Sequence, residues 1–206
     1  MRKHYTLTLT LALSLILASV AVSRGGRNRT DDSSAAIPNI GSTVADFKLK
    51  DADGTEHSLS SLKGKNGTVL IFISTRCPVS NGYNERMEKL AQEYKARGVN
   101  VVGLNANAAE TPDAIKAHAT ENKLTFTILK DKGNKVADQL GAGVTPEAYF
   151  LDASNKLVYH GRIDNHKKPE LVTANDLRDA IDATLAGKPV AKAEAAAFGC
   201  SIKRAS

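Results

Sequence analysis

Residues 68–80 read TVLIFISTRCPVS, and this stretch decides the fold class. Its first seven residues form a near-continuous apolar run, which is typical of a central strand that is buried on both faces of a sheet. Proline is favoured at the first position of a helix, because its missing N–H has no partner there anyway. The stretch therefore predicts a buried strand, a short turn and a helix that starts at Pro78, with Cys77 directly before it.

The segments around this stretch predict an alternation of strands and helices. A pattern of alternating apolar residues before Asp53-Gly54 predicts an N-terminal hairpin. The other elements are expected in chain order: a helix from Pro78 to Gly98, a strand at 99–104, a helix from Pro112, strands at 126–129, 146–151 and 156–160, and a helix that ends before Gly187. This order predicts an α/β domain in three layers, with a mixed central sheet and the hairpin as an extension.

The two ends of the chain lie outside this domain, which we place at residues 41–188. Residues 1–23 combine basic residues, an uncharged run of 18 residues and a small-residue end, which is the pattern of a signal peptide. A retained membrane anchor is the alternative, because about 18 apolar residues is the lower limit for a span. We expect export to the periplasm or the extracellular space, with membrane attachment only if this segment is not cleaved. Residues 24–40 are interpreted as a linker and residues 189–206 as a C-terminal tail.

Charge and cysteine content exclude several classes of protein. The first 30 residues hold five of the 28 basic residues and none of the 22 acidic ones, so the rest of the chain is almost neutral. A folded basic surface for nucleic acid is therefore not supported. Two cysteines are too few for a disulfide-dense scaffold or a four-cysteine zinc site. They leave one disulfide, one reactive thiol with a partner, or two unrelated thiols.

Cys77 stands where a thiol becomes reactive. Only the thiolate attacks, and the start of a helix offers unpaired N–H groups and partial positive charge. Such a site lowers the pKa of a cysteine from about 8.5 to somewhere in the range of roughly 3.5–7.5. Arg76 adds a neighbouring cation, and Ser80 is placed to offer its hydroxyl to the sulfur. The alternative is a buried packing cysteine, which is more natural in the middle of a strand than at this polar junction.

Two short motifs carry a resemblance to a known family. The Cys-Pro-Val-Ser segment at 77–80 between strand and helix, and Val144-Thr145-Pro146 at the start of a later strand, resemble the thioredoxin-like superfamily. The branch that the chain resembles is the redoxins of the alkyl hydroperoxide reductase/thiol-specific antioxidant type, as found in exported thioredoxin-like proteins. The resemblance covers about residues 41–203.

This resemblance implies a function and a set of site residues. It implies a thiol-dependent oxidoreductase in cell redox homeostasis, without a cofactor, whose partners are protein or small-molecule thiols and disulfides. Pro146 is then expected to follow a cis peptide bond and to contact Cys77, and Thr145 to present backbone groups to an extended substrate. Arg76 and Pro78 are expected to border the same substrate.

The chain departs from the family at positions that matter for the reaction. Disulfide oxidoreductases of the superfamily carry a second cysteine where Ser80 stands, and a serine does not resolve a mixed disulfide. Peroxiredoxins carry Pro and Thr or Ser seven and three residues before their peroxidatic cysteine, and here Ser74 fits whereas Leu70 does not. A peroxidase that reacts with peroxide thus stays an alternative. Arg76 or Arg162 would polarise the peroxide in that case, although a salt bridge is the simpler role for each.

Two further alternatives are a metal carrier and a binding module. Copper-carrying redoxins need Cys-x-x-x-Cys, which is missing here, so a soft Cu(I) site would have to use Cys77 and Cys200 with His160 or His166. We expect no metal, because lone histidines in loops are usually only solvated. A non-catalytic module would use the groove at Pro146 to bind extended peptides.

Cys200 is the only other cysteine of the chain and is our candidate to resolve an oxidised Cys77. An alanine-rich stretch after Pro189 separates it from the last helix, so the tail is expected to be loosely tethered. A disulfide needs Cα atoms about 5.5–6 Å apart, and the sequence does not determine that distance. Small external thiols are an alternative resolving partner. Cys200 would otherwise pack with Phe198 and Ile202 or pair between two chains.

Overall fold

The computed structural model describes residue 1 and residues 37–204 of the 206-residue chain. The predicted signal peptide or anchor and most of the predicted linker lie outside the described residues. Within the described residues, no helix has the length and apolar character that crossing a membrane requires.

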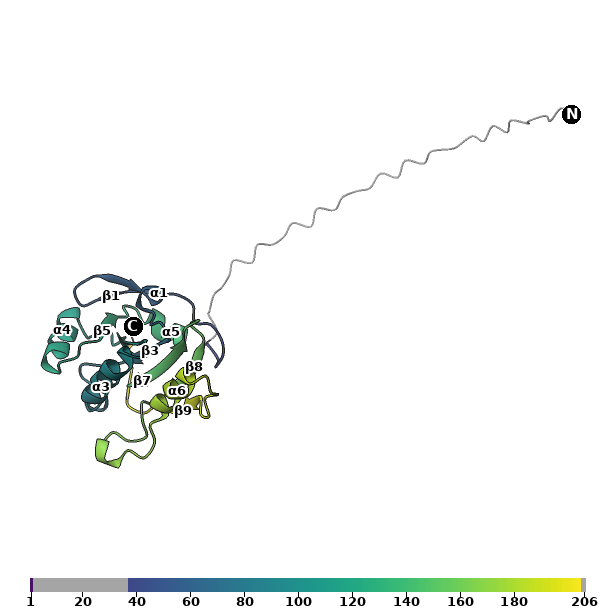
Figure 1. Ribbon diagram of the computed structural model, residues 1–206. Helices are drawn as coiled ribbons and strands as arrows, with labels where there is room; N and C mark the ends of the chain where they lie inside the picture. Colours follow the sequence, from purple (N-terminus) through teal and green to yellow (C-terminus); the bar gives the residue numbers. More distant parts are fainter. Residues whose placement is uncertain (2–36, 205–206) are drawn as a thin grey trace. The chain divides into compact units, whose positions relative to one another are not determined.

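An eight-stranded mixed sheet forms the centre of the fold, in the order β2-β1-β5-β4-β3-β7-β8-β9 (Figure 1). Its strands are β1 (Lys48–Asp51), β2 (Glu56–Ser58), β3 (Gly67–Phe72), β4 (Val99–Asn105), β5 (Thr127–Lys130), β7 (Glu147–Asp152), β8 (Leu157–Gly161) and β9 (Glu194–Ala195). Strands β3, β4 and β5 are parallel, whereas β7 is antiparallel to both of its neighbours. The antiparallel pair of β1 and β2 confirms the predicted hairpin. A separate two-stranded sheet joins β6 (Val144–Thr145) to β10 (Cys200–Ser201).

Helices cover both faces of the large sheet, as Figure 1 shows. They are α1 (Leu59–Leu62), α2 (Pro78–Asn81), α3 (Asn84–Lys95), α4 (Pro112–Glu121), α5 (Lys135–Leu140) and α6 (Asp176–Leu185), with a 3₁₀ turn η1 (Pro169–Leu171). Alternate residues of β3 enter different cores: Val69 and Ile71 pack with α3, α4 and α6, and Leu70 and Phe72 pack with α1 and α5. Because both faces are covered, the strand reads as an unbroken apolar run. The prediction of three layers around a mixed sheet is confirmed.

The helix expected from Pro78 to Gly98 is in fact two helices, α2 and α3. The backbone N–H of Tyr83 donates to the carbonyl of Ser80 at 2.9 Å, which is the tighter 3₁₀ pattern that ends α2. This turn buries the Tyr83 ring, which is 1% exposed, and brings its hydroxyl to 2.8 Å from Asp164. A buried aromatic residue therefore breaks a helix whose apolar spacing alone looked continuous.

The expectation of a loosely tethered C-terminal tail is wrong. Strand β9 extends the large sheet beside β8, and β10 pairs with β6. Ile202 is buried in the core that contains α5, and the N–H of Ile202 donates to the carbonyl of Gly143 at 2.9 Å. The alanine-rich composition is compatible with this close packing, because small side chains let backbone approach backbone. The folded unit thus extends past the predicted boundary at residue 188.

Candidate active site

Cys77 caps the N-terminus of α2, five residues beyond the end of the central strand β3. Pro78 occupies the first turn of the helix, as predicted. The sulfur accepts a hydrogen bond from the backbone N–H of Ser80 at 3.3 Å, and the carbonyl oxygen of Thr145 lies 3.3 Å from the same atom. Cys77 is only 3% exposed. The helix start therefore supplies its polar N–H to a buried sulfur.

Cys200 is bonded to Cys77 in a disulfide, with a Cα–Cα distance of 5.9 Å. Its position follows from the pairing of β10 with β6, in which Cys200 lies opposite Thr145. A side chain at Gly199 would overlap the backbone carbonyl of Thr145, so glycine is what allows the tail to come this close. The intramolecular bond that the sequence left open is thus present in the structure.

The peptide bond between Thr145 and Pro146 is cis, which confirms the conformation that the resemblance implied. Both residues are buried. The backbone of Thr145, which was expected to face an extended substrate, is instead paired with Cys200 of the same chain. The position predicted for a substrate strand is therefore filled by β10.

A buried carboxylate, Glu110, holds the turn that leads to Cys77. Its oxygens accept hydrogen bonds from the Ser74 hydroxyl at 2.6 Å, the Thr75 backbone N–H at 2.8 Å and the Asn105 side-chain amide at 2.6 Å. Burial by itself would raise the pKa of Glu110, but these hydrogen bonds outweigh it and hold that pKa below its ordinary value. Sequence reasoning missed this residue; the available signal was an acid soon after the apolar strand β4, where the ends of parallel strands converge.

The hydroxyl of Ser74 connects Glu110 to the backbone at Cys77. Its oxygen accepts the backbone N–H groups of Arg76 at 3.1 Å and Cys77 at 3.0 Å. The hydroxyl oxygen of Ser80 in turn accepts the backbone N–H of Ser74 at 3.2 Å. The prediction that the Ser80 hydroxyl reaches the sulfur is therefore corrected: the contact to sulfur comes from the backbone of Ser80.

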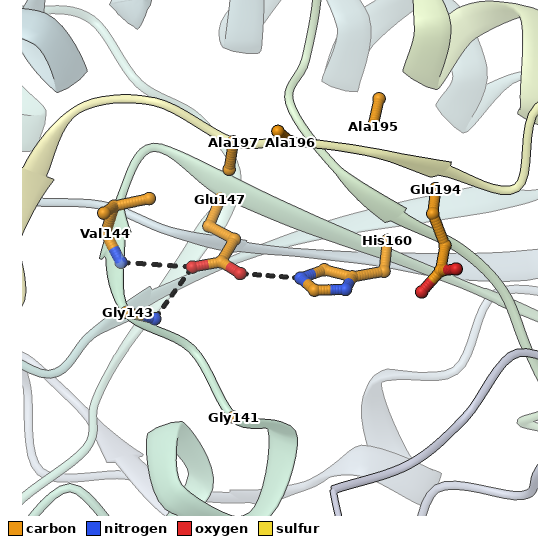
Figure 2. Close-up of a pocket in the computed structure, with 9 residues that line it drawn as sticks. All are labelled: Gly141, Gly143, Val144, Glu147, His160, Glu194, Ala195, Ala196 and Ala197. Atoms are coloured by element: carbon orange, nitrogen blue, oxygen red, sulfur yellow. Dashed lines mark hydrogen bonds and ion pairs between the residues drawn. The ribbon is translucent and has the colours of Figure 1, made fainter.

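A second buried carboxylate, Glu147, directly follows the cis peptide bond and holds the other side of the site (Figure 2). It accepts the backbone N–H groups of Gly143 at 2.9 Å and Val144 at 3.1 Å, and it lies 2.6 Å from a ring nitrogen of His160. Burial acts to raise the pKa of Glu147, but the bond to His160 and the two backbone bonds lower it below its ordinary value. His160 also stacks on the Tyr149 ring at 4.4 Å. It is thus engaged with Glu147 rather than directed at the sulfurs.

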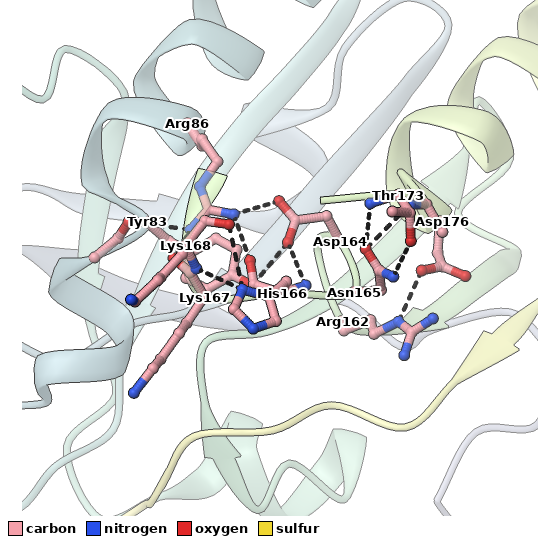
Figure 3. Close-up of polar contacts among 12 residues, drawn as sticks. Tyr83, Arg86, Arg162, Asp164, Asn165, His166, Lys167, Lys168, Thr173 and Asp176 are labelled. Atoms are coloured by element: carbon pink, nitrogen blue, oxygen red, sulfur yellow. Dashed lines mark hydrogen bonds and ion pairs between the residues drawn. The ribbon is translucent and has the colours of Figure 1, made fainter. Parts of the chain in front are cut away.

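Arg162 and His166 make polar contacts in two groups outside the lining of the pocket at the disulfide, as Figure 3 shows. Arg162 forms an ion pair with Asp176 at 2.7 Å, so the simpler role predicted for this arginine is confirmed. Asp164 accepts hydrogen bonds from Arg86 at 2.6 Å and from the backbone N–H of His166 at 3.1 Å. Among the described residues, no group of three or more His, Cys, Asp or Glu residues is arranged to hold a metal ion.

Comparison with known proteins agrees with this geometry. The model of the AhpC/TSA family matches residues 40–160. The chain belongs to the AhpC/TSA family. A thiol-disulfide oxidoreductase ResA from Geobacillus thermodenitrificans (strain NG80-2) is 30% identical over 158 residues, covering 76% of this chain and 87% of the relative. The chloroplastic peroxiredoxin Q of Sedum lineare is 34% identical over 136 residues, covering 62% of this chain and 72% of that protein.

Solved structures share the fold of this chain. A hypothetical protein from Sinorhizobium meliloti 1021 has a TM-score of 0.76 and 35% identity, covering 82% of this chain and 96% of that chain. A structure titled putative thiol:disulfide interchange protein DsbE, from Chlorobium tepidum, has a TM-score of 0.60 and 25% identity, covering 72% of this chain and 99% of that chain. The predictions of a thioredoxin-like redoxin and of a thiol-dependent oxidoreductase are confirmed by these relationships.

In this AhpC/TSA protein the disulfide opens into a pocket of about 390 Å³. Cys77, Cys200 and Glu110 line it, together with the cationic residues Arg76 and Lys203. The structure therefore places Arg76 and the two cysteines around one pocket. Two other residues that were expected to border a substrate lie elsewhere: Thr145 is covered by β10, and Pro78 is exposed on α2 outside the lining of the pocket.

Proposed function

We propose that this protein is a thiol–disulfide oxidoreductase whose redox couple is Cys77 and Cys200. The disulfide between them is the observation that carries the proposal. Strand β10 supplies the second cysteine that the position of Ser80 lacks. In the cycle, the two protein thiols reduce a substrate disulfide to two thiols, and the protein disulfide forms with the transfer of two electrons and two protons. Reduction by external thiols runs the same exchange in reverse.

The surroundings of the two sulfurs support this exchange. In the reduced protein, the N–H of Ser80 at the start of α2 stabilises the thiolate of Cys77. The tail remains anchored on both sides of Cys200, by the pairing of Ala195 with Gly161 and by the burial of Ile202. Cys200 is therefore held near Cys77, and ring closure carries a small entropic cost.

The peroxidase alternative has less support from the same residues. The hydroxyl of Ser74 donates its hydrogen to Glu110, so it is not free to donate to a peroxide. Leu70 is fully buried inside β3, where a peroxiredoxin carries proline. The guanidinium of Arg162 is paired with Asp176. Stabilising a developing oxyanion requires donors that are already aimed at it, and the Ser74 hydroxyl and the Arg162 guanidinium are both engaged with carboxylates.

An exported location is part of the proposal. The basic and apolar pattern of residues 1–23 supports it. Disulfides form and persist outside the reducing cytosol, so such a location suits a Cys77–Cys200 couple.

The test is a comparison of oxidants on the full chain. The reduced protein is mixed with a small disulfide or with hydrogen peroxide, and formation of the Cys77–Cys200 bond is followed by mass mapping. We expect closure with the disulfide to be faster by about ten-fold or more, because the Ser74 hydroxyl and the Arg162 guanidinium are not available to a peroxide. Cys77→Ser and Cys200→Ser should each stop the cycle at a mixed disulfide, and Ser154→Ala, at an exposed serine outside the pocket lining, is the matched control. Faster closure with peroxide would establish a peroxidase, and no reaction with either would establish a binding module.

A further inference from the structure

The two sulfurs of the disulfide differ in how an external thiol reaches them. Cys77 is 3% exposed and lies beneath the pairing of β10 with β6. Cys200 is half-buried and lies on β10 itself. In thiol–disulfide exchange, the accessibility of each sulfur decides where the incoming thiolate attacks. Access therefore favours Cys200.

The stability of the released thiolate also favours attack on Cys200. Attack on Cys200 releases Cys77 as a thiolate at the start of α2, where the N–H of Ser80 donates to its sulfur at 3.3 Å. Attack on Cys77 would release Cys200, whose sulfur has no hydrogen-bond donor among residues 37–204. A stabilised thiolate leaves faster, so exchange at Cys200 is favoured chemically as well as sterically.

The pocket over the disulfide indicates a small partner. Its volume of about 390 Å³ suits a small molecule. An extended peptide would need the backbone edge of Val144 and Thr145, which β10 already occupies. To bind there, a peptide would have to displace a tail that is held by buried Ile202 and by the bond from the Lys203 N–H to the Asn107 side chain at 2.7 Å.

The charges around the pocket indicate an anionic partner. Arg76 is exposed and forms no ion pair with any residue of the described part of the chain. Lys203 is also exposed, and its ammonium contacts only the neutral Ser201 hydroxyl, at 2.7 Å. Glu110 is the one acid in the lining, but it is 3% exposed and its oxygens are filled by donors from Ser74, Thr75 and Asn105. The accessible charge at this opening is therefore positive.

We infer that a small thiol with an anionic group, or its disulfide, binds beside Arg76 and Lys203 and exchanges with Cys200. The incoming thiolate bonds to the Cys200 sulfur while the Cys77–Cys200 bond breaks and its electron pair leaves with Cys77. A second equivalent of the thiol then attacks the mixed disulfide, which yields the small disulfide and the Cys200 thiolate, and both protein thiolates take up protons. This inference rests on the proposed function and adds the class of partner and the sulfur that it meets.

A series of thiols of similar size tests the charge preference. The oxidised full chain is reduced with 2-mercaptoethanesulfonate, 2-mercaptoethanol or cysteamine, which are anionic, neutral and cationic, and each rate is divided by the thiolate fraction. At low ionic strength we expect the anion to react about five-fold faster than the neutral thiol and the cation to be slowest, because the rim is positive. The preference should largely vanish in about 0.5 M salt.

Substitution of the two cationic residues tests whether the preference for an anionic thiol arises at this pocket. Arg76→Gln and Lys203→Gln should each lower the rate of the anionic thiol, relative to that of the neutral thiol, by about two-fold or more. The matched control is Lys95→Gln, an exposed cation at the end of α3 and outside the pocket lining. Equal rates for the three thiols would overturn the inference that the partner is anionic. So would a Lys95→Gln effect as large as those of Arg76→Gln and Lys203→Gln.

Locating the first mixed disulfide tests which of the two protein sulfurs the incoming thiol attacks. Oxidised wild-type protein is mixed with excess 2-mercaptoethanesulfonate, quenched with acid within milliseconds and digested for mass spectrometry. The mixed disulfide is expected on Cys200, and a mixed disulfide predominantly on Cys77 would overturn the assignment. Fast reduction by a dithiol protein together with a flat thiol series would refute this inference alone. If no thiol of either kind reduces the bond, the proposed function itself fails.

Discussion

The two halves of the disulfide are held by different kinds of structure. Cys77 is positioned by side chains, through the chain of hydrogen bonds from Glu110 to the Ser74 hydroxyl and on to the Cys77 backbone. Cys200 is positioned by backbone pairing with Thr145 and by the packing of Ile202. The first arrangement depends on the identity of a few polar residues. The second depends mainly on the absence of a side chain at Gly199.

This difference shows how a fold replaces a missing sequence motif. Ser80 occupies the place where a second cysteine would lie one helical turn from Cys77. A strand from the far end of the chain brings a sulfur to the same neighbourhood by pairing with β6 instead. The two sides can therefore be broken separately by substitution.

Gly199→Ala should have the largest effect, because it acts directly on the backbone contact of β10. The new methyl group would overlap the carbonyl of Thr145, so the strand must shift and carry Cys200 with it. A bonded pair requires Cα atoms about 5.5–6 Å apart, so we expect disulfide closure to slow by about ten-fold or more. Closure is measured by quenched alkylation after addition of a small disulfide.

The matched control for this substitution is Gly143→Ala. Gly143 lies beside β6, but a side chain there would meet no atom within 4 Å. The rate of disulfide closure in Gly143→Ala should equal that of the wild type. If both variants close at the same rate, the close approach at Gly199 does not position Cys200.

Glu110→Gln should have the next largest effect and act on the Cys77 side. The glutamine amide cannot accept all three hydrogen bonds, so a buried donor loses its partner at a cost of about 1–3 kcal/mol. We expect the free energy of unfolding, measured in urea, to fall by that amount. Glu88→Gln is the control, because Glu88 accepts comparable bonds from Thr125 in a more exposed position and should cost less. Equal losses in the two variants would contradict a special role for Glu110.

The smallest effect is expected from pH, and it isolates the charge of Glu110. Its pKa lies below the ordinary value of 4.5, so its contribution to folding is complete above about pH 4.5 and is lost as the pH falls through the depressed pKa. The difference in unfolding free energy between wild type and Glu110→Gln should therefore narrow as the pH is lowered from 7 towards about 3. A difference that stays constant over this range would show that the carboxylate charge contributes nothing.

Local features of the sequence were sufficient to predict the centre of the fold. The apolar run of β3 and the proline after Cys77 predicted a buried strand, a turn and a helix start, and all three are present. The hairpin at Asp53-Gly54 was predicted from its turn residues. These signals work because burial on two faces, helix starts and tight turns each constrain residues that are close together in the chain. The cis bond before Pro146 followed from the family resemblance rather than from its neighbours.

The assembly of the site was decided only by tertiary structure. Strands β9 and β10 have two residues each, which is too short for a periodic pattern, so the tail was mistaken for a loose segment. Glu110 became part of the site because the carboxyl ends of β3 and β4 lie side by side in a parallel pair. The Ser80 hydroxyl bonds to Ser74 because the fold turns it inward, which its spacing from Cys77 did not reveal. Such contacts depend on which distant segments meet, and in this protein that is what joins Cys200 to Cys77.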